Sequence, residues 1–465
     1  MAGKLKKGTA AAANLFRMIF RSPTRIPIFG FAALILIGTL LLMIPAATTI
    51  GAIKPVDALF TAVSASCVTG LVVVDTGRAF STFGKIVILV LIQVGGLGIM
   101  TMSTLFILLG GRRLSLTERV VIQDTFTIGG DRSVAFLIRH VVVFALILEA
   151  IGTVLLFPRF MTGKSAEEAL FFALFHAVSA FCNAGFSFFT QSFSAYREDW
   201  LFNLVISFLV ITGGIGFVVL SELKQHFPFN RRTWSRLSLH AKLVLSVTLL
   251  LLTSGTLLVT LMEWNNTLAP LSVPDRLLAG FFQSVSTRTA GFNTLPIGQM
   301  ANTTLFVFML LMFIGASPGS CGGGIKTTTF ASLIVLGFSR LRGRRQPQVF
   351  QRTISAGSIG RAMSVVLISF MMIGVATMVI LMTELGETPH PESRGKFLEL
   401  FFEVVSAFGT VGLSTGATPG LSTIGKLILS VVMFVGRLGP LVVAMAVSRR
   451  TAPRYYYAEE AIMSG

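Results

Sequence analysis

The sequence is poor in acidic residues, cysteines and histidines. Of its 465 residues, 20 are Asp or Glu, three are Cys and five are His. Cys67, Cys182 and Cys321 are odd in number and lie in apolar or glycine-rich surroundings, so neither a disulfide framework nor a metal cluster is indicated. The HExxH and GxSxG motifs are missing, and no pair of acids is placed to face one cavity. The sequence therefore does not favour an enzyme.

What the chain has in abundance is apolar sequence. Hydrophobic residues make up 53% of it and charged residues 12%, which is more apolar surface than a soluble core can bury. The net charge of +18 would suit a nucleic-acid-binding protein, but such proteins do not carry apolar runs of about 20 residues. We therefore predict a membrane protein with no nucleic-acid partner.

Eight apolar runs are long enough to cross a membrane, because a hydrocarbon core of about 30 Å requires about 20 helical residues. The first run follows a basic N-terminal segment and has the character of a signal-anchor, which we expect to be retained. The runs are residues 26–45, 84–110, 134–157, 200–222, 240–262, 302–337, 361–384 and 421–448.

A shorter apolar stretch, too short to cross, lies between the two runs of each successive pair. Each contains the pattern Phe-x-x-Val-Ser and leads into a glycine, and these glycines recur roughly every 110 residues, a loose internal period. The third repeat is one residue shorter between Ser and Gly. The stretches are residues 56–67, 166–182, 274–288 and 395–409, and the loops that follow are Val68-Thr69-Gly70, Asn183-Ala184-Gly185, Thr289-Ala290-Gly291 and Thr410-Val411-Gly412.

These patterns predict an all-α membrane protein with four tandem repeats, each made of a span, a re-entrant half-helix with its pore loop, and a second span. Eight transmembrane helices and four half-helices would surround one pseudo-fourfold pore. The predicted segments are a basic N-terminus at 1–25, pore repeats at 26–111, 134–223, 240–339 and 361–448, and a tail at 449–465.

Basic residues gather in the segments that precede each repeat, whereas most acids lie in the segments that hold the half-helices. By the positive-inside rule, the basic segments are cytoplasmic. We therefore expect both termini in the cytoplasm and the half-helices entering from outside.

Irregular backbone at membrane depth is tolerated where it lines a cavity, so four glycine loops imply a shared interior site. A half-helix that enters from outside directs its negative dipole end toward the membrane centre, which favours a cation. Backbone carbonyls can then replace the water around the ion, and glycine allows the positive φ that this requires. The alternative is a glycine-rich surface for packing helices together.

The sixth run is interrupted by a segment rich in glycine, which no continuous helix tolerates. As one helix this run would be about 54 Å long, so a mid-membrane loop resolves an excessive length. We expect this loop to act as a plug below the third glycine loop. The alternatives are a phosphate-binding loop, which lacks the preceding strand, and a simple hinge. The candidate gate residues are Gly315, Ala316, Ser317, Pro318, Gly319, Ser320, Gly322, Gly323, Gly324 and Lys326.

Arg437 is a charge in the middle of the final apolar run, and a charge at membrane depth is functional by default. Its alternative role is a structural ion pair with a buried carboxylate such as Glu149 or Glu222. Arg288, Glu403 and His176 lie in or at the end of half-helices. We expect Arg288 and Glu403 to brace the glycine loops from behind, with a solvated outer rim as the alternative.

With these four glycine loops and the interrupted sixth run, the chain resembles the Trk/Ktr/HKT superfamily of potassium transporters over nearly its whole length. Eight spans and residues 459–465 look most like the Ktr membrane subunit. The resemblance implies potassium uptake across the cytoplasmic membrane by a homodimer with one pore per protomer. It also implies a cytoplasmic ring of regulatory nucleotide-binding subunits of the RCK type.

The resemblance further implies that Gly70, Gly185, Gly291 and Gly412 are selectivity-filter glycines that bind K⁺, and that residues 315–326 form an intramembrane gating loop with Arg437 beside it. Glycine at position 70 favours potassium, since a serine there accompanies sodium transport in plant relatives. No organic cofactor is expected in this chain, and sodium dependence stays open.

Other functions are weighed against this one. Sodium conduction or stoichiometric Na⁺/K⁺ cotransport would use the same fold, whereas a symporter built from broken helices predicts inverted repeats. A receptor or scaffold would leave the half-helices unexplained. For partner subunits or anionic membrane lipid, the expected docking surfaces are the basic segment 340–352 and the C-terminal tail.

Overall fold

The structure, a computed structural model, describes residues 25–49, 51–98, 134–226, 231–344 and 346–439. Apart from Arg25, the predicted N-terminal segment lies outside the described residues. So do the predicted tail and the parts of the second and eighth runs beyond residues 98 and 439. Within the described ranges the regular secondary structure is helical except for one short hairpin, so the predicted all-α class is confirmed.

In each predicted repeat, one helix forms the first span and one shorter helix forms the half-helix stretch. The first spans are α2 (Arg25–Leu42), α8 (Val134–Phe160), α13 (Leu239–Glu263) and α17 (Ala356–Glu384). The half-helices are α3 (Pro55–Ser66), α9 (Ala166–Phe181), α14 (Val273–Ser286) and α18 (Lys396–Gly409).

The second spans differ from one repeat to the next. As far as they are described, two of them are single helices, α5 (Thr82–Gly96) and α19 (Thr423–Leu438). The other two are broken into α10 (Trp200–Ile215) with α11 (Phe217–Gln225), and α15 (Asn302–Phe313) with α16 (Thr327–Leu341). The expected interruption of the sixth run is therefore present.

The prediction of one continuous helix over 200–222 is wrong. The axes of α10 and α11 meet at 98°. Gly216 lies at the break with φ +97°, a conformation that L side chains rarely adopt, and an added Cβ would lie 2.6 Å from the carbonyl oxygen of Pro318. The chain turns there because the backbone must make room for the loop between α15 and α16.

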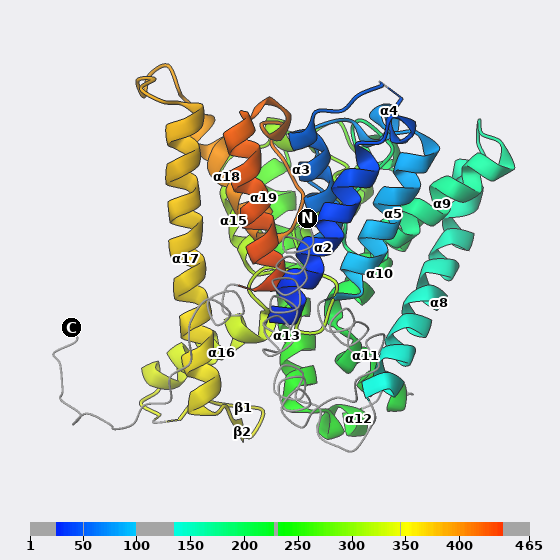
Figure 1. Cartoon of the computed structure of the whole chain (residues 1–465). Coiled ribbons are helices and arrows are strands. Elements are labelled where there is room, and N and C mark those ends of the chain that lie inside the picture. The colour runs from blue at the N-terminus through cyan, green and yellow to red at the C-terminus, as the bar shows by residue number, and fades with distance from the viewer. Residues whose placement is uncertain (1–24, 50, 99–133, 227–230, 345, 440–465) are drawn as a thin grey trace, which may run out of the picture.

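Short elements complete the described part of the chain. They are α4 (Thr76–Ala79), α12 (Arg231–Arg236), the 3₁₀ turns Pro45–Ala47, Ser194–Tyr196, Ile297–Gln299 and Thr418–Gly420, and strands β1 (Gln348–Val349) and β2 (Arg352–Thr353). The strands are antiparallel, with Gln348 opposite Thr353. In Figure 1, α4 lies on the upper side of the molecule, and α12 and the hairpin lie on the lower side.

Three of the described helices are long and apolar enough to cross a membrane: Arg139–Phe160 within α8, then α13 and α17. The bent pair α10–α11 adds a fourth if it counts as one span, and α2, α5, α15 and α16 contain shorter apolar helices. The number of eight spans therefore stays a prediction. α17 stands at the periphery and exposes many apolar side chains, among them Leu367, Phe370 and Met378.

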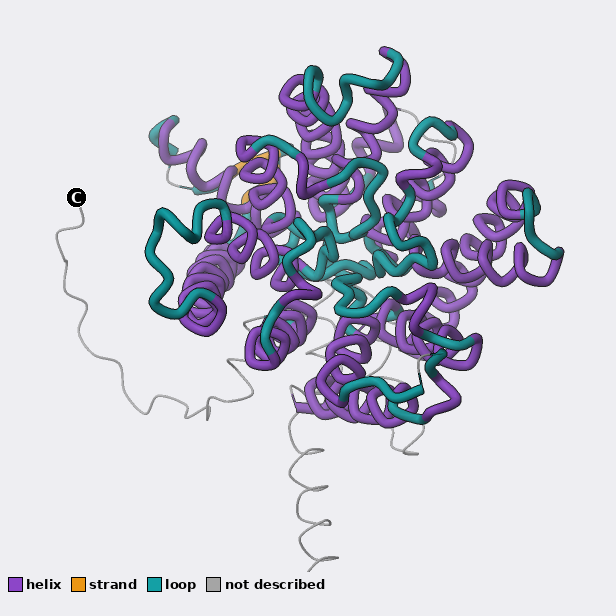
Figure 2. Tube along the Cα trace, turned by 90° about the horizontal axis from the view of Figure 1, so that it is seen from above, coloured by secondary structure: helices purple, strands orange, loops and turns teal. Residues whose placement is uncertain are grey.

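The helices form a closed ring in chain order. The second span of each repeat packs on the half-helix of the next one: α5 on α9, α10 on α14, α15 on α18 and α19 on α3. An ion pair between Lys426 Nζ and Asp57 Oδ1, 2.8 Å long, joins α19 to α3 and so links the fourth repeat to the first. Figure 2 shows the loops gathered at the centre of this ring of helices.

Close helix contacts depend on glycine at one repeated position. Gly95, Gly213 and Gly436 lie in the second spans, where an added Cβ would come closer than 3.0 Å to a backbone carbonyl. Those carbonyls belong to the last residues of the half-helix in the same repeat: Ser66, Phe181 and Phe408. These glycines let each half-helix end near the middle of the molecule.

Candidate functional site

The four glycine loops meet at the centre of the helix ring. An added Cβ on any of the four glycines would lie closer than 3.0 Å to a backbone carbonyl oxygen of the next loop in chain order. The pairs are Gly70 with Ala184, Gly185 with Ala290, Gly291 with Val411, and Gly412 with Thr69. The loops thus form a closed ring of four, which we call the glycine ring.

Each loop has the same backbone shape. The residue two positions before the glycine is left-handed, with φ between 48° and 70°, and the glycine itself has φ between 70° and 93°. The left-handed residues are Val68, Asn183, Thr289 and Thr410. Three of them are β-branched, for which such a conformation costs about 1–3 kcal/mol. Strain of this kind persists only where the surroundings impose it, and it is concentrated at functional sites.

In each repeat, the serine of the Phe-x-x-Val-Ser pattern forms a hydrogen bond from the half-helix to the backbone of the glycine loop that follows it. Ser64 and Ser406 accept a hydrogen bond from the N–H of Gly70 and Gly412, 3.1 Å in each case. In the other two repeats the hydroxyl donates to the carbonyl of the residue after the glycine: Ser179 to Phe186 (2.9 Å) and Ser286 to Phe292. The sequence pointed to these serines only through their recurrence and predicted no role for them.

The loop between α15 and α16, residues 314–326, closes the lower side of the glycine ring. Its ends are joined by a parallel bridge between Ile314 and Ile325. Gly322 and Gly323 lie so close to the Oγ1 atoms of Thr289 and Thr410 that neither could carry a Cβ without a clash. Thr410 directly follows the end of α18, and Thr289 lies three residues after the end of α14, so the α15–α16 loop lies against the inner ends of two glycine loops.

The broken span α10–α11 holds the opposite side of the α15–α16 loop. Breaking a helix leaves backbone groups unpaired, and at membrane depth these need partners. The loop supplies them through three backbone hydrogen bonds: Ser317 N–H to Gly214 O (3.1 Å), Cys321 N–H to Gly213 O (3.0 Å) and Phe217 N–H to Gly319 O (3.1 Å). Sequence reasoning missed this partnership, although Gly213, Gly214 and Gly216 signalled a weak point in the helix.

Two cations hold the same loop by its carbonyl groups. Lys326 Nζ donates to Gly322 O at 2.7 Å. Arg437 is 6% exposed, and its Nη1 and Nη2 donate to the carbonyls of Cys321 and of Gly95 in α5. None of the ion pairs found among the described residues includes Arg437 or Lys326.

The alternative in which Arg437 pairs with a buried carboxylate is wrong. Glu149 accepts a hydrogen bond from Gln93 (3.1 Å), and Glu222 accepts from Ser238 at the start of α13. A phosphate-binding loop at 319–324 is excluded as well, because helix α15 rather than a buried strand precedes it. The glycine loops are not helical, so helix packing does not account for them.

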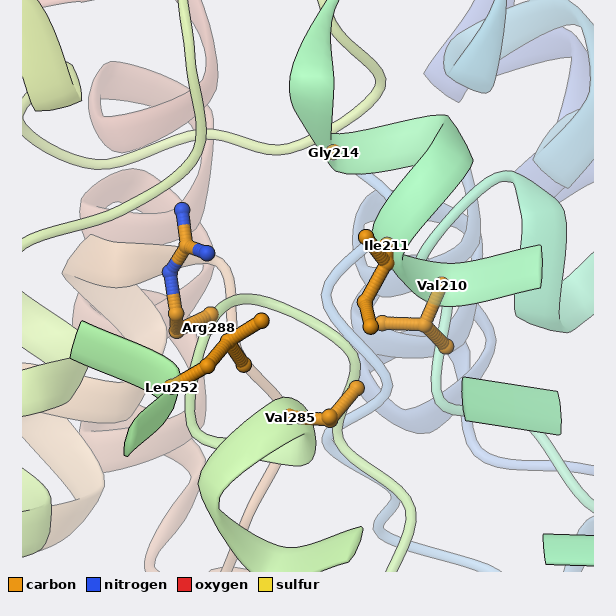
Figure 3. Close-up of a pocket in the computed structure, with 6 residues that line it drawn as sticks. All are labelled: Val210, Ile211, Gly214, Leu252, Val285 and Arg288. Atoms are coloured by element: carbon orange, nitrogen blue, oxygen red, sulfur yellow. The ribbon is translucent and has the colours of Figure 1, made fainter. Parts of the chain in front are cut away.

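Arg288 does not brace a glycine loop in the way we expected. Its side chain is 7% exposed and lines a cavity of about 10 Å³, where it faces Val210 and Ile211 of α10 (Figure 3). Nη2 donates to Thr248 Oγ1 at 3.4 Å, and Nε has no partner there. A cavity of this volume admits at most about one water molecule.

His176 and Glu403 are also buried, at 0% and 1% exposure. A solvated rim is therefore wrong for these two residues and for Arg288. Both His176 and Glu403 form hydrogen bonds with the segment that follows the glycine loop of their own repeat. The structure thus places Glu403 behind a loop, as expected.

Comparison with known proteins gives consistent matches over nearly the whole chain. The family model TrkH, described as cation transport protein, matches residues 12–453. Ktr system potassium uptake protein B of Bacillus subtilis is 41% identical over 96% of this chain and 97% of its own length. Potassium/sodium uptake protein NtpJ of Enterococcus hirae is 36% identical over 96% and 97%. The crystal structure of the potassium transporter TrkH from Vibrio parahaemolyticus has the same fold, with a TM-score of 0.70 and 19% identity over 90% of this chain and 84% of that one.

Proposed function

The chain belongs to the TrkH family of cation transport proteins, and we propose that it takes up potassium ions through the glycine ring. The observation that carries this proposal is the closed arrangement of four loops, each with a strained residue and a glycine of positive φ. Backbone carbonyls in such a ring replace the hydration shell of an ion, and four half-helices aim their negative ends at it. Potassium is supported by the names of the relatives and by glycine at position 70.

In this proposal the residues of the four loops form the selectivity filter, and residues 315–326 with Arg437 form the gate. The α15–α16 loop touches Thr289 and Thr410 at the inner end of the ring, where it would block an ion on its way inward. The loop is tethered by backbone hydrogen bonds and by the cationic side chain of Arg437, while Lys326 binds a carbonyl of the loop itself. A cation near the inner mouth also repels potassium, so the closed loop adds an electrostatic barrier.

We further propose that the half-helices enter from the outside, with both termini in the cytoplasm, and that the protein acts as a homodimer with regulatory nucleotide-binding subunits. The upper side in Figure 1 is then external. The name of one relative describes a component of a system, which supports assembly with partners. On the described lower side, Arg340, Arg342 and Arg352 near the β1–β2 hairpin offer a basic surface for such a partner or for anionic lipid.

The second candidate is sodium conduction or Na⁺/K⁺ cotransport by the same ring. It is favoured by the name of the Enterococcus relative, which includes both ions. Both candidates use the same loops, so the ratio of potassium to sodium uptake distinguishes them.

The test is rescue of potassium uptake in a transport-deficient cell, followed by Gly70→Ser. The serine Cβ would strike the Ala184 carbonyl, and we expect the K⁺/Na⁺ uptake ratio to fall about tenfold. Gly163→Ser is the matched control, since Gly163 has φ +83° but no atom within 4 Å of an added Cβ. If both variants keep the ratio of the unmodified protein, the filter assignment is wrong.

A further inference from the structure

One position in the half-helices repeats in place but not in residue type. It directly follows the Phe of the Phe-x-x-Val-Ser pattern and is occupied by Thr61, His176, Gln283 and Glu403. In three repeats this side chain reaches the segment by which the chain leaves the glycine ring on the upper side. We call these the exit segments: residues 186–188, 292–295 and 413–418.

In the second repeat, His176 is fully buried: one ring nitrogen is bonded to its own half-helix, and the other holds the exit segment. Nδ1 lies 2.7 Å from the carbonyl of Phe172 and must therefore donate to it. Nε2 is then the acceptor, and it takes the N–H of Phe188 at 3.3 Å with Ser187 Oγ at 3.2 Å.

In the third repeat, Gln283 does the same with an amide. In the orientation that satisfies both ends of the amide, its oxygen accepts from the N–H groups of Thr294 (3.0 Å) and Leu295 (3.1 Å). The Gln283 side chain is fully buried, so the two N–H groups that it binds depend on its oxygen rather than on solvent for a hydrogen-bond acceptor.

In the fourth repeat, Glu403 receives four hydrogen bonds. Oε1 accepts from Thr415 N–H (2.9 Å), Ser414 Oγ (2.7 Å) and Thr415 Oγ1 (3.0 Å), and Oε2 accepts from Thr418 Oγ1. A carboxylate buried without a cation is costly unless hydrogen bonds satisfy it, and here the exit segment supplies all of them.

The three sets share one register. In all three, partners stand 11 and 12 residues after the half-helix side chain, and the residue at 12 donates its backbone N–H: Phe188, Leu295 and Thr415. This spacing is the same in the third repeat, although that repeat is one residue shorter between Ser and Gly. Glu403 has a further partner at 15, Thr418. The first repeat differs, because Thr61 donates back to Asp57 in its own helix (2.8 Å) and the residues at the corresponding places are Val72 and Val73.

We propose that His176, Gln283 and Glu403 are positioning residues for ion selection: each fixes the outer end of its glycine loop, and the first loop is the adaptable member of the ring. The proposal rests on the proposed function, since it gives these residues a purpose only if the ring selects ions. Simple filling of the protein interior does not explain it, because three different side chains accept from a backbone N–H at the same register.

The experiment compares Gln283→Met and Glu403→Leu, which remove the acceptor, with Glu403→Gln, which keeps an acceptor oxygen for Thr415. The measurement is the ratio of potassium to sodium uptake by cells that produce the full chain. This ratio is a property of each pore and does not depend on how many pores fold, so a loss of folded protein alone does not move it.

We expect the ratio to fall about tenfold in Gln283→Met and Glu403→Leu, because each leaves a buried N–H without a partner. Glu403→Gln should stay within about threefold of the unmodified protein, since the acceptor remains. Thr61→Val is the matched control from the first repeat and should change the ratio by less than about twofold, because its hydroxyl bonds only to its own helix.

The inference is overturned if Gln283→Met and Glu403→Leu keep the ratio while Gly70→Ser lowers it, a result that would leave the filter proposal intact. A fall in Thr61→Val as large as in Gln283→Met would also overturn it, since the position would then act through packing. If Gly70→Ser also leaves the ratio unchanged, the proposed function itself fails. Gln283→Met exchanges one uncharged side chain for another of similar volume, so it carries the test if Glu403→Leu does not reach the membrane.

Discussion

The two sides of the glycine ring are held in opposite ways. On the upper side, His176, Gln283 and Glu403 fix exit segments that lie only 11 and 12 residues away in the same repeat. On the lower side, the ring is covered by a loop that is tied to other repeats, through backbone hydrogen bonds with the broken span α10–α11 and through Arg437 of α19. The upper contacts lie within one repeat, so they need not change when the α15–α16 loop moves. The lower contacts all hold that loop, so a single movement of the loop would break them together. Under the proposed function, this difference would place ion selection on the upper side and opening on the lower side.

The largest effect is expected from removing the α15–α16 loop, which covers the lower side of the glycine ring. Deleting residues 317–323 leaves Ala316 and Gly324 to be joined, and an added Cβ on Gly324 would lie 3.2 Å from Gly315 Cα, so the ends are already close. We expect potassium uptake to rise about tenfold with an unchanged K⁺/Na⁺ ratio, because the barrier is lost and the ring is not. Uptake kinetics at matched protein amounts measure this. Unchanged flux would make the segment a hinge, and a changed ratio would mean that the two sides are not separate.

Neutralising the cation at position 437 weakens the lower cover without shortening it. Arg437→Gln loses the charge and one of two donors, so we expect a rise in uptake of about fivefold. Arg437→Lys keeps the charge, so its uptake should lie between that of the unmodified protein and that of Arg437→Gln. The check is flux normalised to protein that elutes as a single species in detergent. Aggregation of Arg437→Gln with no gain in flux would instead assign Arg437 to folding.

A single methyl group tests the tether between the α15–α16 loop and the broken span. In Gly216→Ala the Cβ would lie 2.6 Å from Pro318 O and would push the loop away. We expect about a threefold increase in uptake. Gly214→Ala is the matched control, because its Cβ would meet nothing closer than 3.4 Å. Equal fluxes in the two variants would show that the bend at Gly216 does not hold the loop.

The smallest effect is expected where the ring closes between its fourth and first repeats. Lys426→Met or Asp57→Asn breaks a partly buried ion pair and should cost about 1–2 kcal/mol, which lowers Tm by a few degrees and leaves the K⁺/Na⁺ ratio unchanged. The double variant should lose less than the sum of the two single losses, since both remove one interaction. Additive losses would mean that the pair contributes nothing to stability.

The sequence predicted the elements that depend on local pattern. The half-helices, the glycine positions and the break before Lys326 follow from apolar length, from recurrence and from the intolerance of helices for glycine and proline. The bend at Gly216 did not follow, because glycine also occurs inside continuous helices, as Gly255 does in α13. What distinguishes Gly216 is the Pro318 carbonyl packed against it, and no sequence pattern displays such a neighbour.

The candidate site was predictable to the same extent. Its four glycines were found because they repeat as glycine, whereas Gln283 was missed because its counterparts are Thr, His and Glu. The interpretation of Arg437 as part of an ion pair failed for a related reason. Its partners are backbone carbonyls of Cys321 and Gly95, and every residue has a carbonyl.

The closed glycine ring has a direction. Each glycine packs against the loop of the repeat that follows it in the chain, and the glycine of the fourth repeat packs against the loop of the first. The order of the repeats in the chain is therefore also their order around the ring axis. The ring therefore has a handedness, and its four members resemble one another without being interchangeable. A chain with its second and third repeats exchanged would keep every glycine, yet three of its four junctions would bring together surfaces that were never shaped to fit.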